Sequence, residues 1–296
     1  MSGIDPANPV IRFGPAGAAD DFYAEKKGRS STEMPAWLRG LGLDAFEYQC
    51  GRGVNISLEK AAALGAAARE NGVALSLHAP YYISLTSLEQ DKRENNINYI
   101  LQSAQAAAAM GACRVVVHTG SAGGAAGGSA ARKNALAAAA DMLALALAAL
   151  EANGLGHVRL CPETMGKINQ LGTLEEVLRL AAGDERLIPC VDFGHLNART
   201  HGGLKTEDDF AALLDVMENA IGRERASAMH CHFSKIEYSA GGELRHLTFE
   251  DAAFGPDFAP LAKVIKRRGY HPVFICESRG TQSRDAVSMR RVYDEA

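Results

Sequence analysis

The segment LIPCVDF, residues 187–193, is apolar at almost every position and delivers a carboxylate, Asp192, near its end. A strand with apolar side chains on both faces is typical of a parallel sheet that helices cover on both sides. The same kind of segment recurs along the whole chain. We therefore expect strands at 10–14, 45–50, 73–79, 113–119, 157–163, 187–193, 227–233 and 271–277.

Segments with a helical pattern alternate with these strands. We expect helices at 57–71, 88–110, 129–153, 172–182, 206–221, 257–268 and 281–293. Eight strand–helix units in 296 residues predict an α/β protein with a (β/α)₈ TIM barrel, as a single domain over residues 1–296. A doubly wound open sheet is the alternative, but no G-x-G-x-x-G turn follows the first strand.

Composition narrows the function classes. The net charge of -4 excludes a general binder of polyanions, so any contact with nucleic acid needs a local basic patch. None of the six cysteines forms a C-x-x-C pair, which predicts reduced, buried thiols. The first ten residues, MSGIDPANPV, lack the features of a signal peptide. The apolar helix segment ALAAAADMLALALAAL contains Asp141 and falls short of the roughly 18 to 20 residues that cross a bilayer.

We therefore expect a cytoplasmic protein that binds no membrane. The Ala/Gly-rich stretch 121–140 is interpreted as a flexible loop that leads into an Ala-rich helix.

Residue types that bind metals gather where the expected strands end. Active sites of TIM barrels lie at the carboxyl ends of the strands, so these side chains should share one face. Several carboxylates and imidazoles packed there without cations would cost many kcal/mol in desolvation and repulsion. The sequence therefore predicts a metal site, with zinc or manganese as suitable ions. Its candidate ligands are His78, His118, Glu163, Asp192, His195, His230, His232 and Glu277, with Glu243 and His246 from the loop after the seventh strand.

The seventh strand offers two histidines. His230 and His232 are two residues apart, so both should point to the same side of the strand, and Cys231 should point outward between sheet and helices. We expect one of the two histidines to bind metal and the other to support it or to contact the substrate.

These strand ends resemble the endonuclease IV family, the AP endonuclease family 2 of the xylose-isomerase-like barrels, from about residue 11 to 280. LHAPYYISL matches the family's His-x-x-Tyr with His78 and Tyr81, and VVVHTGS matches its His-Pro-Gly-Ser. PETMGK corresponds to Glu-Asn-Thr-x-Gly, and CVDFGH to Cys-x-Asp-x-x-His. MHCHFSK matches Met-His-x-Asn-Asp-x-Lys, which places His230 rather than His232 at the ligand position, and ICESR supplies Glu277.

The resemblance implies a metal-dependent phosphodiester hydrolase that cleaves DNA at abasic sites. In that family three zinc ions activate a water molecule and stabilise the leaving oxygen. Two or three Zn²⁺ are thus expected here, with Mn²⁺ or Mg²⁺ as alternatives, in a monomer that binds abasic or damaged DNA. Glu163 and Glu277 would be the catalytic, metal-bridging carboxylates, and the substrate contacts would be Tyr81, Arg52, His232 and Lys235.

The chain departs from the family pattern in two loops. The family's Asp-x-His after the seventh strand is missing from GGELRHLTFED, where Glu243 and His246 could substitute. The loop CGRGVNIS after the second strand has Arg52 but lacks the aromatic residue that the family inserts against DNA.

Two other functions remain open from the sequence. Related sugar or sugar-phosphate isomerases and epimerases use a single metal, for which Glu163, Asp192, His230 and Glu277 would suffice. A barrel that binds metal without catalysis is the third possibility, because fold alone does not determine function. The surplus histidines His78, His118 and His195 favour the multinuclear hydrolase.

Overall fold

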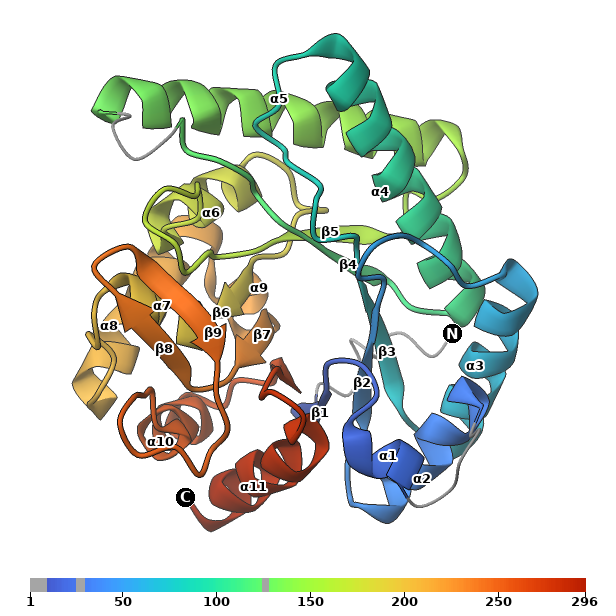
Figure 1. Ribbon diagram of the computed structural model, residues 1–296, viewed down its shortest axis with the longest axis vertical. Coiled ribbons are helices and arrows are strands. Elements are labelled where there is room, and N and C mark those ends of the chain that lie inside the picture. The colour runs from blue at the N-terminus through green and yellow to red at the C-terminus, as the bar shows by residue number, and fades with distance from the viewer. Residues whose placement is uncertain (1–9, 25–29, 124–127) are drawn as a thin grey trace.

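The computed structural model describes residues 10–24, 30–123 and 128–296, and Figure 1 shows helices arranged around a central ring of strands. The segment MSGIDPANPV, which lacks the pattern of a signal peptide, falls largely on residues 1–9, and these lie outside the described residues. Residues 124–127 of the Ala/Gly-rich loop also lie outside them.

The described residues form eight parallel barrel strands, and each overlaps a segment expected from the sequence. Two four-stranded sheets, ordered β1-β10-β7-β6 and β2-β3-β4-β5, contain them. Parallel bridges join Ala16 to Glu47 at one seam and Glu163 to Cys190 at the other, so the sheets close into a barrel. The predicted TIM barrel is confirmed. Its strands are β1 (Arg12–Pro15), β2 (Ala45–Gln49), β3 (Ala74–His78), β4 (Arg114–Val117), β5 (Arg159–Pro162), β6 (Cys190–Asp192), β7 (His230–Phe233) and β10 (Val273–Cys276).

The seven expected helices are present with nearly the expected bounds. They are α3 (Leu58–Asn71), α4 (Gln90–Met110), α5 (Ser129–Ala152), α6 (Leu174–Ala182), α8 (Glu207–Ile221), α10 (Phe258–Arg268) and α11 (Gln282–Glu295). Helix ends follow local chemistry: Ser57 caps α3, and Gly72 ends it in the left-handed conformation that glycine adopts easily.

Several elements were not expected from the sequence. Short helices are α1 (Asp20–Ala24), η1 (Ser31–Glu33), α2 (Met34–Gly40), α7 (Phe193–Arg199) and α9 (Arg223–Ser227). A hairpin of β8 (Ile236–Ser239) and β9 (Gly242–His246) follows β7. The hairpin and α7 both supply candidate ligands, so these unexpected elements bear directly on the site.

Helix α5 corrects one expectation. It has 24 residues, and its most apolar window has a mean hydropathy of 1.8, so by length and composition it could cross a membrane. The segment ALAAAADMLALALAAL is therefore part of a longer apolar helix. In the barrel, α5 lies against α4 and α6 and buries Met142, Leu143 and Leu147 in the main core.

The main hydrophobic core lies between the strands and the helices. Phe13, Leu77 and Val115 belong to it, and so does Cys231, which points outward from β7 as expected. The described cysteines are all free thiols, and Cys113 alone among them is not fully buried. β1 and β2 approach so closely at Gly14 that a methyl group there would lie 1.7 Å from the carbonyl oxygen of Ala45. Glycine is therefore required at this position.

Candidate metal centre

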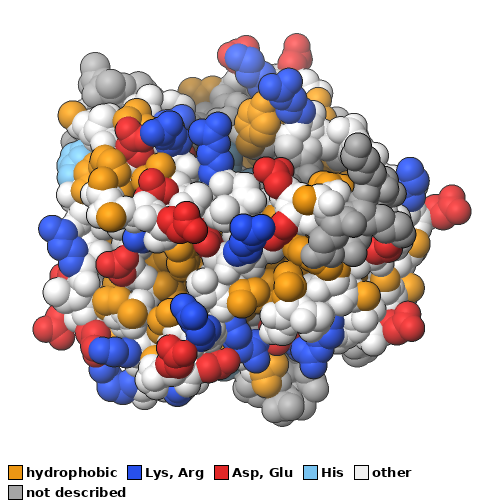
Figure 2. All heavy atoms as spheres, turned by 60° about the horizontal axis from the view of Figure 1, so that its bottom comes forward, with side chains coloured by type: hydrophobic (Ala, Val, Ile, Leu, Met, Phe, Trp, Pro, Cys, Tyr) orange, Lys and Arg blue, Asp and Glu red, His pale blue; other side chains and the backbone are white. Residues whose placement is uncertain are grey.

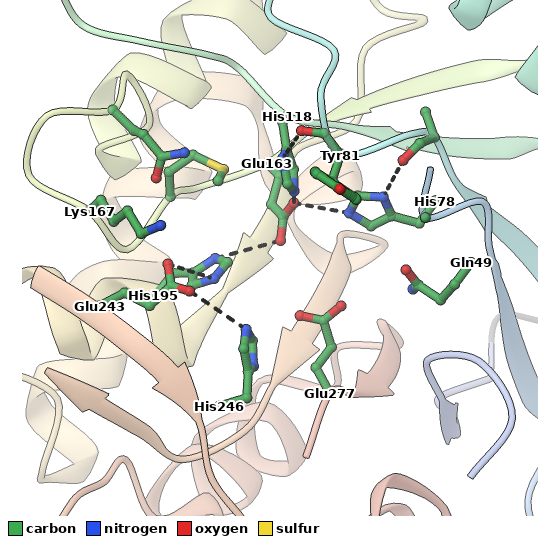
Figure 3. Close-up of a pocket in the computed structure, with 14 residues that line it drawn as sticks. Gln49, His78, Tyr81, His118, Glu163, Lys167, His195, Glu243, His246 and Glu277 are labelled. Carbon is green, nitrogen blue, oxygen red and sulfur yellow. Dashed lines mark hydrogen bonds and ion pairs between the residues drawn. The ribbon is translucent and has the colours of Figure 1, made fainter. Parts of the chain in front are cut away.

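A polar cavity opens at the carboxyl ends of the barrel strands, and its volume is about 310 Å³. Figure 3 shows imidazoles and carboxylates from several strands pointing into it. The sequence-predicted residues that line it are His78, Tyr81, His118, Glu163, His195, Glu243, His246 and Glu277. The barrel thus brings together side chains that are up to 199 positions apart, counting from His78 to Glu277.

The first ligand group consists of His78, His118 and Glu163. Nε2 of His78 and Nε2 of His118 each lie 3.3 Å from Glu163 Oε2. His78 ends β3, while His118 and Glu163 directly follow β4 and β5, so the parallel strands set this arrangement. Potential ligand atoms of all three residues lie within 4.8 Å of one another, which is close enough to share one ion.

The second ligand group shares Glu163 with the first and adds Asp192, His232 and Glu277. Nδ1 of His232 lies 3.0 Å from Glu163 Oε1 and 3.4 Å from Glu277 Oε2. Asp192 caps α7, because its Oδ1 accepts a 2.7 Å hydrogen bond from the backbone N–H of His195. Its other oxygen, Oδ2, is buried without a hydrogen-bond partner, as a metal ligand would be.

The third ligand group joins α7 to the β8–β9 hairpin. Nε2 of His195 lies 3.4 Å from Glu243 Oε2, and Nε2 of His246 lies 3.9 Å from Glu243 Oε1. The structure therefore gathers the Glu243–His246 pair, suggested as a substitute for the family's Asp-x-His, beside His195.

Four of the histidines are oriented through their other ring nitrogen. Nδ1–H of His78 donates to the carbonyl oxygen of Ala79 at 2.7 Å, and Nδ1–H of His118 donates to the backbone carbonyl oxygen of Tyr81 at 3.0 Å. Nδ1–H of His195 donates to the Thr164 carbonyl at 2.9 Å. Nδ1 of His246 lies 2.8 Å from Ser234 Oγ. Each ring thus turns Nε2 toward a carboxylate, an arrangement that suits metal-binding histidines.

The charges of the site shift the pKa values of its members. Burial would lower the pKa of both His78 and His195. Glu163 raises the pKa of His78 to about 9, and Asp192 raises the pKa of His195 to about 9. Burial would raise the pKa of both Glu163 and Glu277, but the charge of His232 opposes it. The pKa of Glu163 is thereby held well below its usual range, and the pKa of Glu277 is lowered to about 2.

Asp192 behaves differently, because its burial raises its pKa to about 6. Protons on imidazoles therefore balance the carboxylates of this site. Because a divalent cation would take their place, metal binding should release protons. The mixed imidazole and carboxylate donors fit zinc or manganese.

The resemblance places His230 at the ligand position of β7, and the structure brings both histidines of this strand into possible ligand groups, because His230 and His232 form a further group with Cys190. His232 pairs in register with Asp192 and belongs to the second ligand group. His230 pairs with Cys190, one layer deeper in the barrel, and its Nε2 lies 2.8 Å from Glu47. Both side chains point inward as expected, but the later residue of a strand lies nearer the carboxyl-end face. The residue of β7 that belongs to the second ligand group is therefore His232, and His230 lies beneath it.

The predicted substrate contacts have different surroundings. Tyr81 lines the cavity and is half exposed. Arg52 is exposed on the loop after β2 and is not among the cavity-lining residues. Nζ of Lys235 donates to the Asp251 carbonyl at 2.6 Å and lies 3.3 Å from Asp257, away from the cavity. A role for Lys235 in substrate contact therefore has no geometric support.

Sequence reasoning missed two residues of the site. Lys167, on the loop after β5, lines the cavity. Glu47 in β2 is fully buried beneath the ligand groups and contacts both His230 and His232. A charged residue inside the apolar strand segment AFEYQC was the available signal for Glu47.

Comparisons with known proteins agree with this geometry. The model of the xylose isomerase-like TIM barrel family matches residues 35–293. The chain is 33% identical to the uncharacterized protein MJ0133 of Methanocaldococcus jannaschii, over 97% of this chain and 98% of that protein. It is 32% identical to the probable endonuclease 4 of Staphylococcus carnosus, over 64% of this chain and 60% of that protein.

Solved structures share the fold at lower identity. A D-tagatose 3-epimerase-like protein gives a TM-score of 0.69 at 21% identity and covers 96% of both chains. Endonuclease IV from Thermus thermophilus gives a TM-score of 0.66 at 21% identity and covers 96% of this chain and all of that chain. The resemblance to endonuclease IV that the strand ends indicate is therefore confirmed, and epimerase-like proteins share the same barrel.

Proposed function

Because the chain belongs to the xylose isomerase-like TIM barrel family, we propose that it is a metal-dependent phosphodiester hydrolase that cleaves DNA at abasic sites. One observation supports the proposal: the first, second and third ligand groups each supply side chains to one cavity, and the first two share Glu163. A mononuclear enzyme would need only the second group. The two flanking groups, which contain His78, His118, His195 and His246, favour a multinuclear centre.

Zinc ions bound in these groups would supply a water nucleophile at neutral pH and neutralise charge on the phosphate. Glu163 would fix the spacing of two ions because each of its oxygens faces a different ligand group. The Nδ1–H bonds of His78 and His118 to backbone carbonyls hold their rings against rotation.

The chain's remaining cavity residues would bind and orient the substrate. Lys167 would contact a phosphate oxygen from one side of the cavity, and Tyr81 offers a half-exposed ring on the other side of Glu163. We expect DNA to present a single nucleotide-sized group to this cavity of about 310 Å³. A cytoplasmic, monomeric enzyme acting on abasic or damaged DNA remains our expectation.

A single-metal sugar or sugar-phosphate epimerase is the second candidate. The group of Glu163, Asp192, His232 and Glu277 is a complete one-metal set by itself. This alternative predicts about one ion per chain and little effect of replacing His118.

The test combines a metal count with two activity assays. Elemental analysis of the untreated protein should find two or three ions per chain, and an abasic-site duplex should be cleaved until a chelator removes them. His118→Ala should lose about one ion and lower cleavage by at least about 100-fold. His157→Ala is the matched control, because His157 is exposed at the start of the strand-five segment, away from the cavity.

Two outcomes would reject the hydrolase. Fully metal-loaded protein that leaves abasic DNA intact would exclude it. One ion per chain together with epimerisation of a ketose sugar would establish the second candidate instead.

A further inference from the structure

Glu47 is a fully buried carboxylate that lies beneath the ligand groups rather than among them. It sits on β2 in register with Ser76 of β3, one layer below the His78 level. Burying a carboxylate costs several kcal/mol unless its oxygens are well paired. The barrel therefore retains Glu47 in the interior for its contacts.

Four polar side chains surround this carboxylate. Ser76 Oγ donates to Oε2 at 3.0 Å, and Gln49 Nε2 donates to Oε1 at 3.0 Å. Nε2 of His230 lies 2.8 Å from Oε2, and Nε2 of His232 lies 3.0 Å from Oε1. The His232 N–H is not in line with the oxygen, so this last contact is a close ion pair rather than a full hydrogen bond.

His232 differs from the other histidines of the ligand groups in the partner that orients it. Backbone carbonyls hold His78, His118 and His195, and Ser234 lies beside His246. His232 has the carboxylate of Glu47 behind it. A carboxylate partner holds the ring nitrogen proton more strongly than a neutral acceptor and makes the opposite nitrogen a better metal ligand.

The two ring nitrogens of His232 face opposite parts of the barrel. Nε2 faces Glu47 below as an ion-pair contact, while Nδ1 is hydrogen-bonded to Glu163 Oε1 at 3.0 Å in the mouth. A divalent ion bound there would replace the proton on Nδ1. We propose that Glu47 is a positioning residue: it keeps the proton of His232 on Nε2, so that Nδ1 is presented to the ion of the second ligand group. This inference rests on the metal centre of the proposed function.

His230 helps to hold the Glu47 carboxylate in place. Its Nε2–H holds the second oxygen of Glu47, and its Nδ1 is buried without a hydrogen-bond partner. His230 and Ser76 together fix the carboxylate from the side away from His232. The sequence-predicted ligand His230 thus acts on the metal through Glu47.

Zinc affinity of the Glu47→Gln variant tests the proposal. Glutamine keeps the shape of the side chain but removes the charge that holds the Nε2 proton. Competition with a coloured chelator should show that zinc at the second group binds about 10- to 100-fold more weakly than in wild type. Glu59→Gln is the matched control, because it makes the same change of charge at an exposed position of α3; its zinc affinity should stay near wild type.

Two further measurements separate positioning from a general structural role. In a His232→Ala background, Glu47→Gln should weaken zinc binding no further, because the imidazole through which Glu47 acts on zinc has already been removed. In nitrogen NMR spectra of the zinc-loaded wild type, Nε2 of His232 should carry a proton and Nδ1 should show the chemical shift of a zinc-bound nitrogen. This second measurement needs no variant, so it decides the question even if Glu47→Gln fails to fold.

The outcomes are distinct. Wild-type zinc affinity in Glu47→Gln, an undiminished effect in the His232→Ala background, or zinc on Nε2 of His232 would each overturn the inference. A wild-type chain that takes up no zinc would overturn both this inference and the proposed function. Weakened zinc binding in Glu47→Gln together with inactivity on abasic DNA would overturn the proposed function alone.

Discussion

Glu163 is the residue that the first and second ligand groups share. Its Oε2 faces His78 and His118, while its Oε1 faces His232. Glu163→Gln should therefore lower the metal content by about two ions per chain, as measured by elemental analysis after dialysis. Glu277→Gln is the matched control: it alters a carboxylate of one group only and should cost about one ion. Equal losses in the two variants would contradict the sharing.

Glu243 tests the third ligand group independently of the first two. It lies between His195 and His246 and belongs to neither of the other groups. Glu243→Gln should remove about one ion and leave the rest bound with unchanged affinity. Glu237→Gln alters a carboxylate on the neighbouring strand of the same hairpin, where it pairs with Arg245. If this control loses the same ion, the hairpin fold rather than the Glu243 carboxylate holds the metal.

The sequence identifies most single residues of the cavity because parallel strands deliver their last side chains to one face. Its failures have physical causes. His230 and His232 both point into the barrel, and the family motif favoured His230, which lies deeper. Later residues of a strand lie nearer the carboxyl-end face, and this direction would have favoured His232 for the second ligand group. Glu47 was missed because its partner His230 is 183 positions away, and nothing near it in the sequence shows what neutralises it.

At the level of elements, the eight strands and seven large helices follow from apolar periodicity, whereas the β8–β9 hairpin and α7 do not. The hairpin turns between Ser239 and Gly242, and its Gly-Gly pair was a usable turn signal. Helix α7 has only seven residues, too few for a periodic pattern, and it starts because Asp192 caps it. Both elements depend on contacts that form only after the barrel closes.

Helix α6 offers a prediction about stability at the element scale. Glu176 completes the capping box with Thr173, and its Oε2 also accepts hydrogen bonds from Arg132 of α5 at 2.7 Å and from Gly172 at 2.8 Å. Arg132 in turn donates to the Ile168 carbonyl in the loop after β5. This one carboxylate therefore ties α6 to α5 and to the loop that carries Lys167.

Glu176→Gln should lower the free energy of unfolding at pH 7 by about 1 to 3 kcal/mol, measured by urea denaturation. Burial would raise the pKa of Glu176, but hydrogen bonds from Arg132 and the backbone hold it below the usual value. A lowered folded-state pKa stabilises the fold above the unfolded-state pKa, and this contribution is lost as pH falls through the folded value. The difference between variant and wild type should thus shrink in acid. Glu175→Gln, at an exposed neighbouring position, should change little at any pH.

At the scale of the whole molecule, surface charge gives DNA little general attraction. The net charge is -4, and Figure 2 shows Lys and Arg mixed with Asp and Glu over the face that it presents. The cavity itself contains Glu163, Glu243 and Glu277. Bound cations would reverse the sign of charge at the mouth, so recognition of a phosphodiester would depend on the metals rather than on a basic surface.

Metal removal should destabilise the whole barrel, because the ligands come from strands and loops on both sides of it. Each ion that binds only the folded chain adds about 2.7 kcal/mol at a free concentration 100 times its dissociation constant. For a chain of this size that corresponds to a rise in Tm of roughly 4 °C per ion. Calorimetry with excess zinc and with a strong chelator should therefore differ by on the order of 10 °C. Glu163→Gln should show a much smaller difference, because it lacks the carboxylate that joins two groups. An equal Tm with and without chelator would mean that no ion links these strands, and the multinuclear centre would have to be abandoned.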